Sequence, residues 1–235
     1  MEVAAIIPAH LDSVRFPRKV LAQINGKTIL QHVYEKVKST KHINNVYIAT
    51  ADDEIIAEVK SFHADLIRTG NYHTSGTSRI SEAASKINAD VIINVQADEP
   101  LIQPRLLNKL TEIMLDDGRI EILTPVKRIE DSKEVKDVNV VKVVFDKDLN
   151  ALYFSRHSIP YGGSEFFKHI GVYCFRRDFI INYSGLAKSF LEEEEKLEQL
   201  RFLWNGYRIR VFITDFESIS VDTKEDFQKV ERILR

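Results

Sequence analysis

Cysteine is almost absent from this chain, because Cys174 is the only one among 235 residues. A single thiol cannot form an intramolecular disulfide, and it excludes any cysteine-rich zinc module. Cys174 stands in the apolar run 172–175, which favours a buried structural thiol. The chain therefore depends on a packed core, and its 44% hydrophobic residues are enough to form one.

An excess of charge is missing too, since 33 Lys+Arg against 35 Asp+Glu give a net charge of −2. A dedicated nucleic-acid binder usually carries a clear basic excess. No apolar stretch approaches the ~20 residues that span a bilayer. The N-terminus has no basic region and runs through Val3–Ile7 into Pro8, which predicts a first strand and not a signal peptide. We expect a cytoplasmic protein without nucleic-acid or membrane partners.

The nine glycines form neither common phosphate-binding fingerprint. Gly-x-Gly-x-x-Gly and Gly-x-x-x-x-Gly-Lys-Ser/Thr are both missing, so a P-loop is unsupported and a Rossmann dehydrogenase is a poor alternative. No repeat, low-complexity tract or Gly/Ser linker divides the chain. We expect a single domain over residues 1–235.

Short apolar runs alternate with longer amphipathic segments in the first half. Expected strands are Val3–Ile7, Asn45–Thr50, Val91–Val95 and Ile120–Val126. Expected helices are Thr28–Ser39, Glu54–Phe62, Ser78–Lys86 and Pro104–Leu115. Such alternation predicts an α/β fold with a mainly parallel sheet and right-handed crossovers.

The second half changes character. Strands are expected at Val138–Phe145, Ala151–Ser155, Ile170–Phe175 and Arg208–Thr214, and helices at Arg177–Ser184, Phe190–Trp204 and Lys224–Leu234. Because the first three of these strands have no long helix between them, we expect a smaller antiparallel lobe. The expected division is at about residue 130.

The loop after the first strand gathers positive charge. Arg15, Arg18, Lys19 and His10 all lie within residues 8–19. In parallel sheets, ligands bind at the carboxyl ends of the strands. Cations clustered there repel one another unless an anion compensates, and a polyphosphate would do so. From the residues alone, a polyphosphate site and a solvated basic loop are equally good interpretations.

The strand Val91–Val95 ends in a polar cluster that contains Asp98 and Glu99. A carboxylate at this edge is well placed for Mg²⁺, which usually takes one or two carboxylates besides phosphate oxygens and water. The alternative is an acidic turn that caps the helix beginning at Pro104.

Taken together, the motifs resemble the CMP-Kdo synthetase (3-deoxy-manno-octulosonate cytidylyltransferase) family from Ile6 to about Phe227. Nine landmarks carry the resemblance in order: Ile7-Pro8-Ala9, Ser13-x-Arg15-x-Pro17-x-Lys19, Asn25-Gly26-Lys27, His73-x-Ser75-Gly76-Thr77-x-Arg79, Asn94-Val95-Gln96-x-Asp98-Glu99-Pro100, Ala151-Leu152-Tyr153-Phe154-Ser155-Arg156-x-x-Ile159-Pro160, His169-x-Gly171-x-Tyr173, Leu197-Glu198-Gln199-Leu200-Arg201 and Val221-Asp222-Thr223-x-Glu225-Asp226.

The resemblance implies a nucleotide-diphospho-sugar transferase-like three-layer α/β sandwich. It implies transfer of CMP from CTP to the anomeric hydroxyl of 3-deoxy-D-manno-octulosonate (Kdo), for lipopolysaccharide synthesis. In-line transfer of this kind depends on positioning and charge neutralisation. The first half would bind the nucleotide, the second would bind the sugar and form a homodimer, and Mg²⁺ would be the cofactor.

Residue roles are implied in the same way. The nucleotide-binding set would be Pro8, Ala9, His10, Ser13, Arg15, Lys19, Ser75, Gly76, Thr77 and Arg79. The sugar-binding set would be Gln96, Arg156, His169, Tyr173, Glu198 and Gln199. Asp98 and Asp222 would be the metal ligands, and with Lys19 they would be the catalytic residues.

Simpler interpretations stand beside these roles. Arg156 could be a surface arginine, and His169 with Tyr173 a packed core pair, since residues four apart on a strand face the same side. The Glu198–Gln199 pair could border the apolar stripe of its helix. Asp222 could only cap the helix that follows.

The first loop departs from the family pattern. His10 stands at the usual arginine, Arg18 at the usual glycine and Val20 at the usual proline. Ala97 replaces a glycine and Ser78 an acidic residue. One hypothesis is that Arg18 supplies the charge that His10 lacks.

Three other functions stay open. The sugar could be 8-amino-Kdo or a sialic acid, although the sialic-acid enzymes lack the Tyr-Phe-Ser-Arg and Leu-Glu-Gln-Leu-Arg segments. A catalytically silent paralogue that binds a nucleotide and regulates a partner is the third, and only His10 favours it.

Overall fold

The first half of the chain folds as its alternating pattern predicts. In the computed structural model, which describes residues 1–13, 15–216 and 219–235, four strands run parallel in the order β5–β4–β1–β6. Their bounds are β1 Val3–Pro8, β4 Asn45–Thr50, β5 Asp65–Arg68 and β6 Val91–Asn94. Every residue of β1 and β6 is buried, as expected where helices cover both faces of a parallel sheet.

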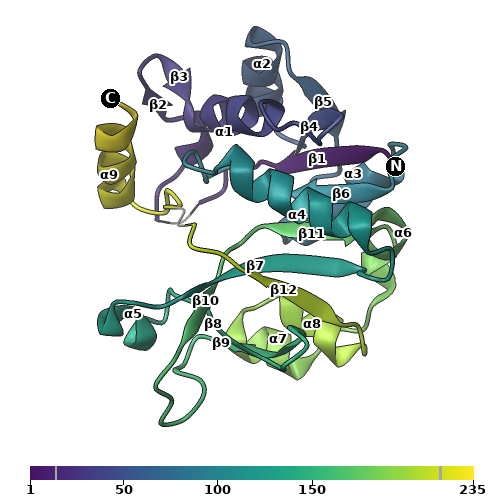
Figure 1. Cartoon of the computed structure of the whole chain (residues 1–235). Helices are drawn as coiled ribbons and strands as arrows, with labels where there is room; N and C mark the ends of the chain where they lie inside the picture. The colour runs from purple at the N-terminus through teal and green to yellow at the C-terminus, as the bar shows by residue number, and fades with distance from the viewer. Residues whose placement is uncertain (14, 217–218) are drawn as a thin grey trace.

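Helices form a layer on each face of this sheet (Figure 1). On one face lie α1 (Ile29–Lys38), α2 (Asp53–Ser61) and α4 (Pro104–Asp116), and on the other lies α3 (Gly76–Ser85). Local signals set their ends. The Thr28 side chain accepts a hydrogen bond from the Gln31 N–H at the start of α1, and Pro104 occupies the first turn of α4.

The second half adds antiparallel strands to the same sheet. β11 (Tyr173–Arg176) lies antiparallel between β6 and β7 (Ile122–Arg128). β10 (Phe167–His169), β8 (Lys142–Phe145) and β9 (Ala151–Ser155) continue it, whereas β12 (Ile209–Ile213) runs parallel to β7. The expected α/β sandwich with an antiparallel lobe is confirmed, and the lobe extends the main sheet.

The C-terminal helix returns to the first loop. α9 (Lys224–Leu234) packs beside the hairpin of β2 (Gln23–Ile24) and β3 (Lys27–Thr28), and a short 3₁₀ turn, Lys19–Leu21, precedes that hairpin (Figure 1). A separate apolar cluster joins them, with Ile24, Ile29, Val221 and Val230 buried at its centre. The segment before α9 is thereby held next to residues 15–21.

Several expected boundaries are wrong. The helix expected at 190–204 is two helices, α7 (Phe190–Glu195) and α8 (Gln199–Trp204), because Lys196 adopts a left-handed conformation with φ 56°. The helix expected at 177–184 is α6 (Arg177–Ile180) followed by a 3₁₀ turn, and the strand expected from residue 138 begins at Lys142. β5, β10 and the short helix α5 (Ser132–Lys136) were not anticipated.

Within the described part of the chain, no helix combines the length and the apolar character that crossing a membrane requires.

Candidate active site

Two adjacent parallel strands deliver the first candidate residues. β1 and β6 pair directly, so the segments after Pro8 and Asn94 leave the sheet at the same edge. The segment before α9 joins them there, because the Val221 N–H donates a hydrogen bond of 2.8 Å to the carbonyl oxygen of Asp98. Three stretches far apart in sequence therefore meet at one place.

Lys19 connects the two predicted metal ligands at this place. Its Nζ donates to Asp98 Oδ2 at 2.5 Å and to Asp222 Oδ1 at 2.8 Å. Arg15 reaches Asp222 Oδ2 at 3.0 Å. Burial alone would lower the pKa of Lys19, but attraction and hydrogen bonds from Asp98 and Asp222 outweigh it, so the pKa is raised. Two carboxylates and two cations form a mutually neutralising cluster.

The simpler interpretations of these carboxylates do not hold. Thr223 is the N-cap of α9 and forms a capping box with Asp226, so Asp222 is free of that task. The N-cap position of α4 is Gln103, several residues beyond Asp98. Both aspartates instead turn toward Lys19.

The donor set at this cluster fits Mg²⁺. Asp98 and Asp222 offer hard carboxylate oxygens, and the two already converge on one ammonium group. Across residues 1–13, 15–216 and 219–235, no three His, Cys, Asp or Glu side chains gather as a metal site. Two carboxylates, with phosphate oxygens and water to complete the coordination, are what Mg²⁺ usually takes.

The other predicted residues of the first loop lie less directly at the cluster. Pro8 and Ala9 are buried, and the Ala9 N–H donates to the Ala49 carbonyl at 2.9 Å. His10 is exposed and Ser13 is half-buried. Their roles as nucleotide contacts stay predictions.

Arg18 points away from the cluster. Its guanidinium pairs with Glu54 at the start of α2, so the arrangement gives no support to the hypothesis that it replaces a charge at position 10. Its backbone is left-handed, with φ 60°. That conformation explains why a glycine would suit this position.

The predicted turn 75–79 begins α3. Ser75 is the N-cap, and its Oγ accepts from the Ser78 N–H at 3.2 Å. Gly76 lies against the first loop, because a Cβ there would be 3.6 Å from Pro8 Cγ. Arg79 is buried and donates to Thr69 Oγ1 at 2.6 Å and to the Gly70 carbonyl at 3.3 Å. Arg79 thus binds the preceding loop through one side-chain hydroxyl and one backbone carbonyl.

All six predicted sugar-binding residues line one cavity of about 370 Å³. They come from four parts of the fold, and Gly76 and Thr77 of the predicted nucleotide set line the same cavity. The sugar set comprises Gln96, Arg156, His169, Tyr173, Glu198 and Gln199. Because Gln96 belongs to the first half of the chain and the rest to the second, the cavity lies between the two halves.

His169 is held in the cavity wall as a neutral imidazole. Burial lowers its pKa to about 3. Thr124 Oγ1 lies 2.9 Å from His169 Nε2 and also 2.8 Å from the Val172 carbonyl. The threonine hydroxyl has one proton, which it donates to the carbonyl, so it accepts from His169 Nε2–H and leaves Nδ1 as a hydrogen-bond acceptor.

The neighbouring Tyr173 has a hydroxyl without a partner. Its ring lies 5.2 Å from that of His169, and its oxygen is buried with no hydrogen bond to any described residue. Buried polar atoms are nearly always hydrogen-bonded in proteins. The Tyr173 hydroxyl is thus left over for a ligand or a water, and its role in sugar binding stays a prediction.

The break between α7 and α8 brings a carboxylate to the cavity. Glu198 immediately precedes α8, and Gln199 is buried in its first turn. Burial raises the pKa of Glu198, and hydrogen bonds from Thr77 and Ser75 oppose the shift. A single continuous helix over 190–204 would not have this geometry.

Arg156 lines the cavity but is already engaged. Its Nε donates to the Glu195 carbonyl at 2.8 Å and its Nη1 to the Val138 carbonyl at 2.9 Å. The carbonyl of Arg156 accepts from Lys142 Nζ, a fully buried ammonium that also binds the carbonyls of residues 137 and 140. Arg156 thus keeps few N–H groups for a ligand.

Sequence reasoning missed the residues that hold Arg156. Lys142 falls in a strand-like run, and Glu195, whose carboxylate accepts from Ser155 Oγ at 2.7 Å and from the Arg156 N–H at 2.8 Å, falls in an acidic run. Only the long-range contacts distinguish them from surface charges.

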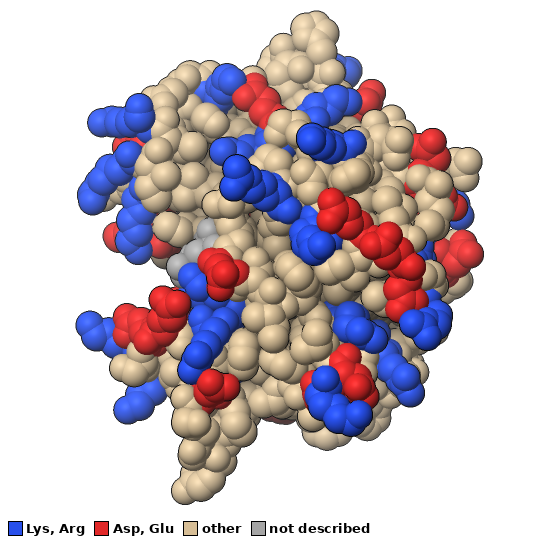
Figure 2. All heavy atoms as spheres, viewed as in Figure 1, with Lys and Arg blue, Asp and Glu red and all other residues tan. Residues whose placement is uncertain are grey.

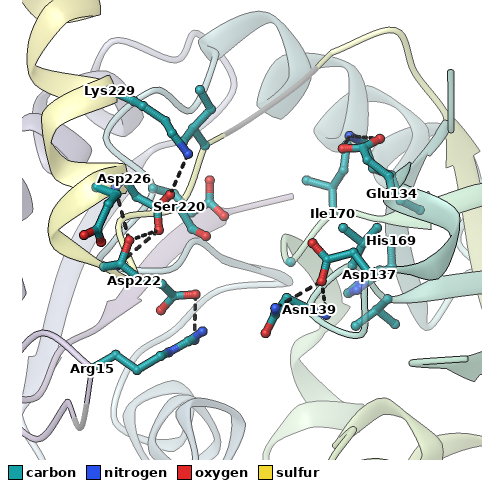
Figure 3. Close-up of a pocket in the computed structure, with 18 residues that line it drawn as sticks. Arg15, Glu134, Asp137, Asn139, His169, Ile170, Ser220, Asp222, Asp226 and Lys229 are labelled. Atoms are coloured by element: carbon teal, nitrogen blue, oxygen red, sulfur yellow. Dashed lines mark hydrogen bonds and ion pairs between the residues drawn. The ribbon is translucent and has the colours of Figure 1, made fainter. Parts of the chain in front are cut away.

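A larger cleft of about 730 Å³ adjoins the sugar cavity, since His169 and Gly171 line both. One wall carries Arg15, Asp222 and the start of α9, and the other carries His169 with the segment 134–141 (Figure 3). In the space-filling view the molecule is hollowed between α9 and α5, and both lips carry charges of both signs (Figure 2). The cleft thus links the carboxylate cluster to the sugar cavity.

Comparison with known proteins identifies the family of the chain. The profile of a family described as cytidylyltransferase matches residues 4–211. The 3-deoxy-manno-octulosonate cytidylyltransferase of Solibacter usitatus is 45% identical, over 100% of this chain and 95% of its own. The 8-amino-3,8-dideoxy-manno-octulosonate cytidylyltransferase of Shewanella amazonensis is 43% identical, over 100% and 99%.

Among solved structures, a CMP:2-keto-3-deoxy-manno-octonic acid synthetase complexed with CTP superimposes with a TM-score of 0.95. It is 38% identical and covers 100% of this chain and 98% of its own.

Proposed function

The chain belongs to the CMP-Kdo synthetase (3-deoxy-manno-octulosonate cytidylyltransferase) family, and we propose that it transfers CMP from CTP to the anomeric hydroxyl of Kdo. The hydroxyl oxygen attacks the α-phosphorus, the bond from that phosphorus to the bridging oxygen breaks, and pyrophosphate leaves. The product, CMP-Kdo, serves lipopolysaccharide synthesis.

One observation carries the proposal. The six residues assigned to the sugar line one cavity, and that cavity opens through His169 toward the cluster of Lys19, Asp98 and Asp222. A sugar in the cavity and a triphosphate at the cluster would be neighbours, and holding two reactants in this way supplies much of the catalysis in such a transfer.

Lys19 and Arg15 are the proposed cations that neutralise the charge of the triphosphate. Lys19 and Arg15 are both bound to Asp222, and an incoming triphosphate would compete with this carboxylate for both cations. Charge-assisted contacts of this kind stabilise the additional negative charge that develops on the phosphates in the transition state.

Neutral groups orient the sugar. His169 Nδ1 can accept from a sugar hydroxyl and the Tyr173 hydroxyl can donate to one, because neither has another partner among the described hydrogen bonds. Arg156 is a cation that lines the cavity, as Lys196 also does, and it can bind the sugar carboxylate through the N–H groups that its carbonyl contacts leave over.

Asp98 and Asp222 are the proposed ligands of Mg²⁺. When bound, the ion supplies Lewis-acid neutralisation and alignment of phosphate oxygens. The chain's own contribution is to point both carboxylates at one place.

A second candidate is the same transfer to 8-amino-Kdo. The Shewanella amazonensis relative that carries this name is as similar over its full length as several Kdo enzymes are. The two sugars differ at one substituent.

Pyrophosphate release tests the proposal. The protein is incubated with Mg²⁺, CTP and Kdo, with 8-amino-Kdo and UTP in parallel. Release that requires both CTP and Kdo supports it. Release only with the amino sugar moves the substrate to the second candidate, and CTP binding without release from any sugar favours a regulatory paralogue.

We also propose a cytoplasmic homodimer, as the family resemblance implies. Sedimentation of the purified protein tests the dimer, and a monomer at micromolar concentration would contradict it.

A further inference from the structure

His73 stands between two side chains of α3. Its Nδ1 lies 2.6 Å from Ser78 Oγ, and its Nε2 lies 2.6 Å from Glu82 Oε2. The His73 side chain is 3% exposed. Ser78 and Glu82 are one helical turn apart, so both face the histidine from the same side of α3. The imidazole is fixed at both nitrogens.

Glu82 collects further donors from the same loop. Its Oε2 accepts from the Gly70 N–H and the Tyr72 hydroxyl, both at 3.0 Å, and its Oε1 accepts from Lys86 at 2.6 Å. Burial would raise the pKa of Glu82, but these hydrogen bonds together lower it to about 2. The carboxylate is ionised at neutral pH and ties residues 70–73 to the helix.

The same unit continues into the active site. Ser75 caps α3 through the N–H of Ser78, the residue that also binds His73. Gly76 and Thr77 follow at once and line the sugar cavity, and Thr77 hydrogen-bonds Glu198 across it. A shift of His73 would therefore move the first turn of α3 relative to Glu198.

We propose that Glu82, acting through His73, is a positioning residue that sets the first turn of α3 and with it the Thr77 side of the sugar cavity. It touches no substrate itself. The inference rests on the proposed function of that cavity. Networks in which each member is satisfied hold such geometry, and small displacements of a binding group are costly in rate or affinity.

The test replaces Glu82 without changing its size. E82Q keeps an acceptor for the Gly70 N–H, but the side chain that faces His73 loses its negative charge. The Michaelis constant for Kdo at saturating CTP is expected to rise about tenfold, the effect of one charge-assisted hydrogen bond, while kcat changes less than about twofold. The Michaelis constant for CTP is expected to change less than that for Kdo.

A second substitution tests the path through His73. S78D in the E82Q background places a carboxylate at the other nitrogen of the same imidazole, and it is expected to recover most of the Kdo affinity. The matched control is E112Q. Glu112 is also a helical glutamate with a histidine and a lysine partner, and its Oε1 lies 3.5 Å from His42 Nε2, but it belongs to α4 and not to α3. E112Q is expected to match the parent enzyme.

An E82Q enzyme with unaltered Kdo affinity would overturn the inference. Equal losses of affinity for CTP and for Kdo, with no rescue by S78D, would also overturn it, because they would indicate a general loss of structure. Calorimetric titration of each protein with Kdo, at saturating CTP without metal, gives the same comparison without turnover. A parent protein that binds Kdo but releases no pyrophosphate would contradict the proposed reaction and leave the positioning test intact.

Discussion

The Val221 N–H donates to the carbonyl oxygen of Asp98 at 2.8 Å, and this hydrogen bond joins the segment before α9 to the loop that follows β6. Asp222, the next residue, is thereby brought beside Asp98, with Lys19 between the two carboxylates. The site is assembled by a backbone contact between segments that lie far apart in sequence.

Asp98→Asn is expected to lower kcat by at least about 100-fold, the usual cost of removing a group that stabilises charge in the transition state. CTP binding is expected to fall much less, since Arg15 and Lys19 stay in place. Steady-state kinetics and calorimetry measure the two effects. Asp178→Asn, at a side chain that is 97% exposed, is the control. A fully active Asp98→Asn enzyme would disprove the metal assignment.

Lys19→Met leaves Asp98 and Asp222 facing each other without the ammonium between them. Folding raises the pKa of Lys19 above its ordinary value of 10.5. The charged side chain therefore contributes fully to the free energy of unfolding below pH 10.5, and this contribution is lost as the pH rises through the pKa of the folded protein. At pH 7.5 the variant is therefore expected to melt at a lower temperature.

Added Mg²⁺ is expected to raise the Tm of Lys19→Met more than that of the parent, because the ion then has no ammonium to displace. Differential scanning fluorimetry with millimolar Mg²⁺ measures this, and Lys147→Met, at an 89% exposed lysine, is the control. Equal Mg²⁺ shifts in all three proteins would argue against a site at these carboxylates.

His169 should make stability depend on pH. Its pKa falls from 6.5 to about 3 on folding, so only the unfolded chain takes up its proton between these values. Its contribution is complete above pH 6.5 and is lost as pH falls toward 3, by about 1 kcal/mol for each pH unit. Urea unfolding of His169→Gln at pH 7 and pH 5 is expected to show a smaller pH dependence than the parent. His42→Gln, at a 41% exposed histidine, should match the parent.

Tyr173→Phe separates folding from binding. The hydroxyl is buried without a partner, so its removal is expected to leave the free energy of unfolding unchanged or increase it by about 1 kcal/mol. The Michaelis constant for Kdo is expected to rise about fivefold, because the sugar loses a donor. Loss of stability with unchanged kinetics would indicate a structural role only.

Much of the fold could be predicted because buried strands and helices show as apolar runs and apolar periodicity in the sequence. β1 and β6 are wholly apolar except at their ends, and α1 and α4 have capping signals and a clear apolar face. β5 was missed because Asp65-Leu66-Ile67-Arg68 is short and charged at both ends. The break at Lys196 was missed because a left-handed lysine has no local sequence signal.

The meeting of Lys19 with Asp98 could be predicted, because the motifs that contain them follow two neighbouring parallel strands. Residues that act through partners could not. Glu82 and Lys142 occupy ordinary positions in a helix and a strand, and only the folded chain shows that they collect donors or acceptors from distant loops.

The most direct test of the proposed reaction is pyrophosphate release by the purified protein given CTP, Kdo and Mg²⁺, with each component omitted in turn. We predict release that stops when CTP, Kdo or Mg²⁺ is left out. A folded protein that binds CTP and releases no pyrophosphate with Kdo, or one that is equally active without Mg²⁺, would contradict it.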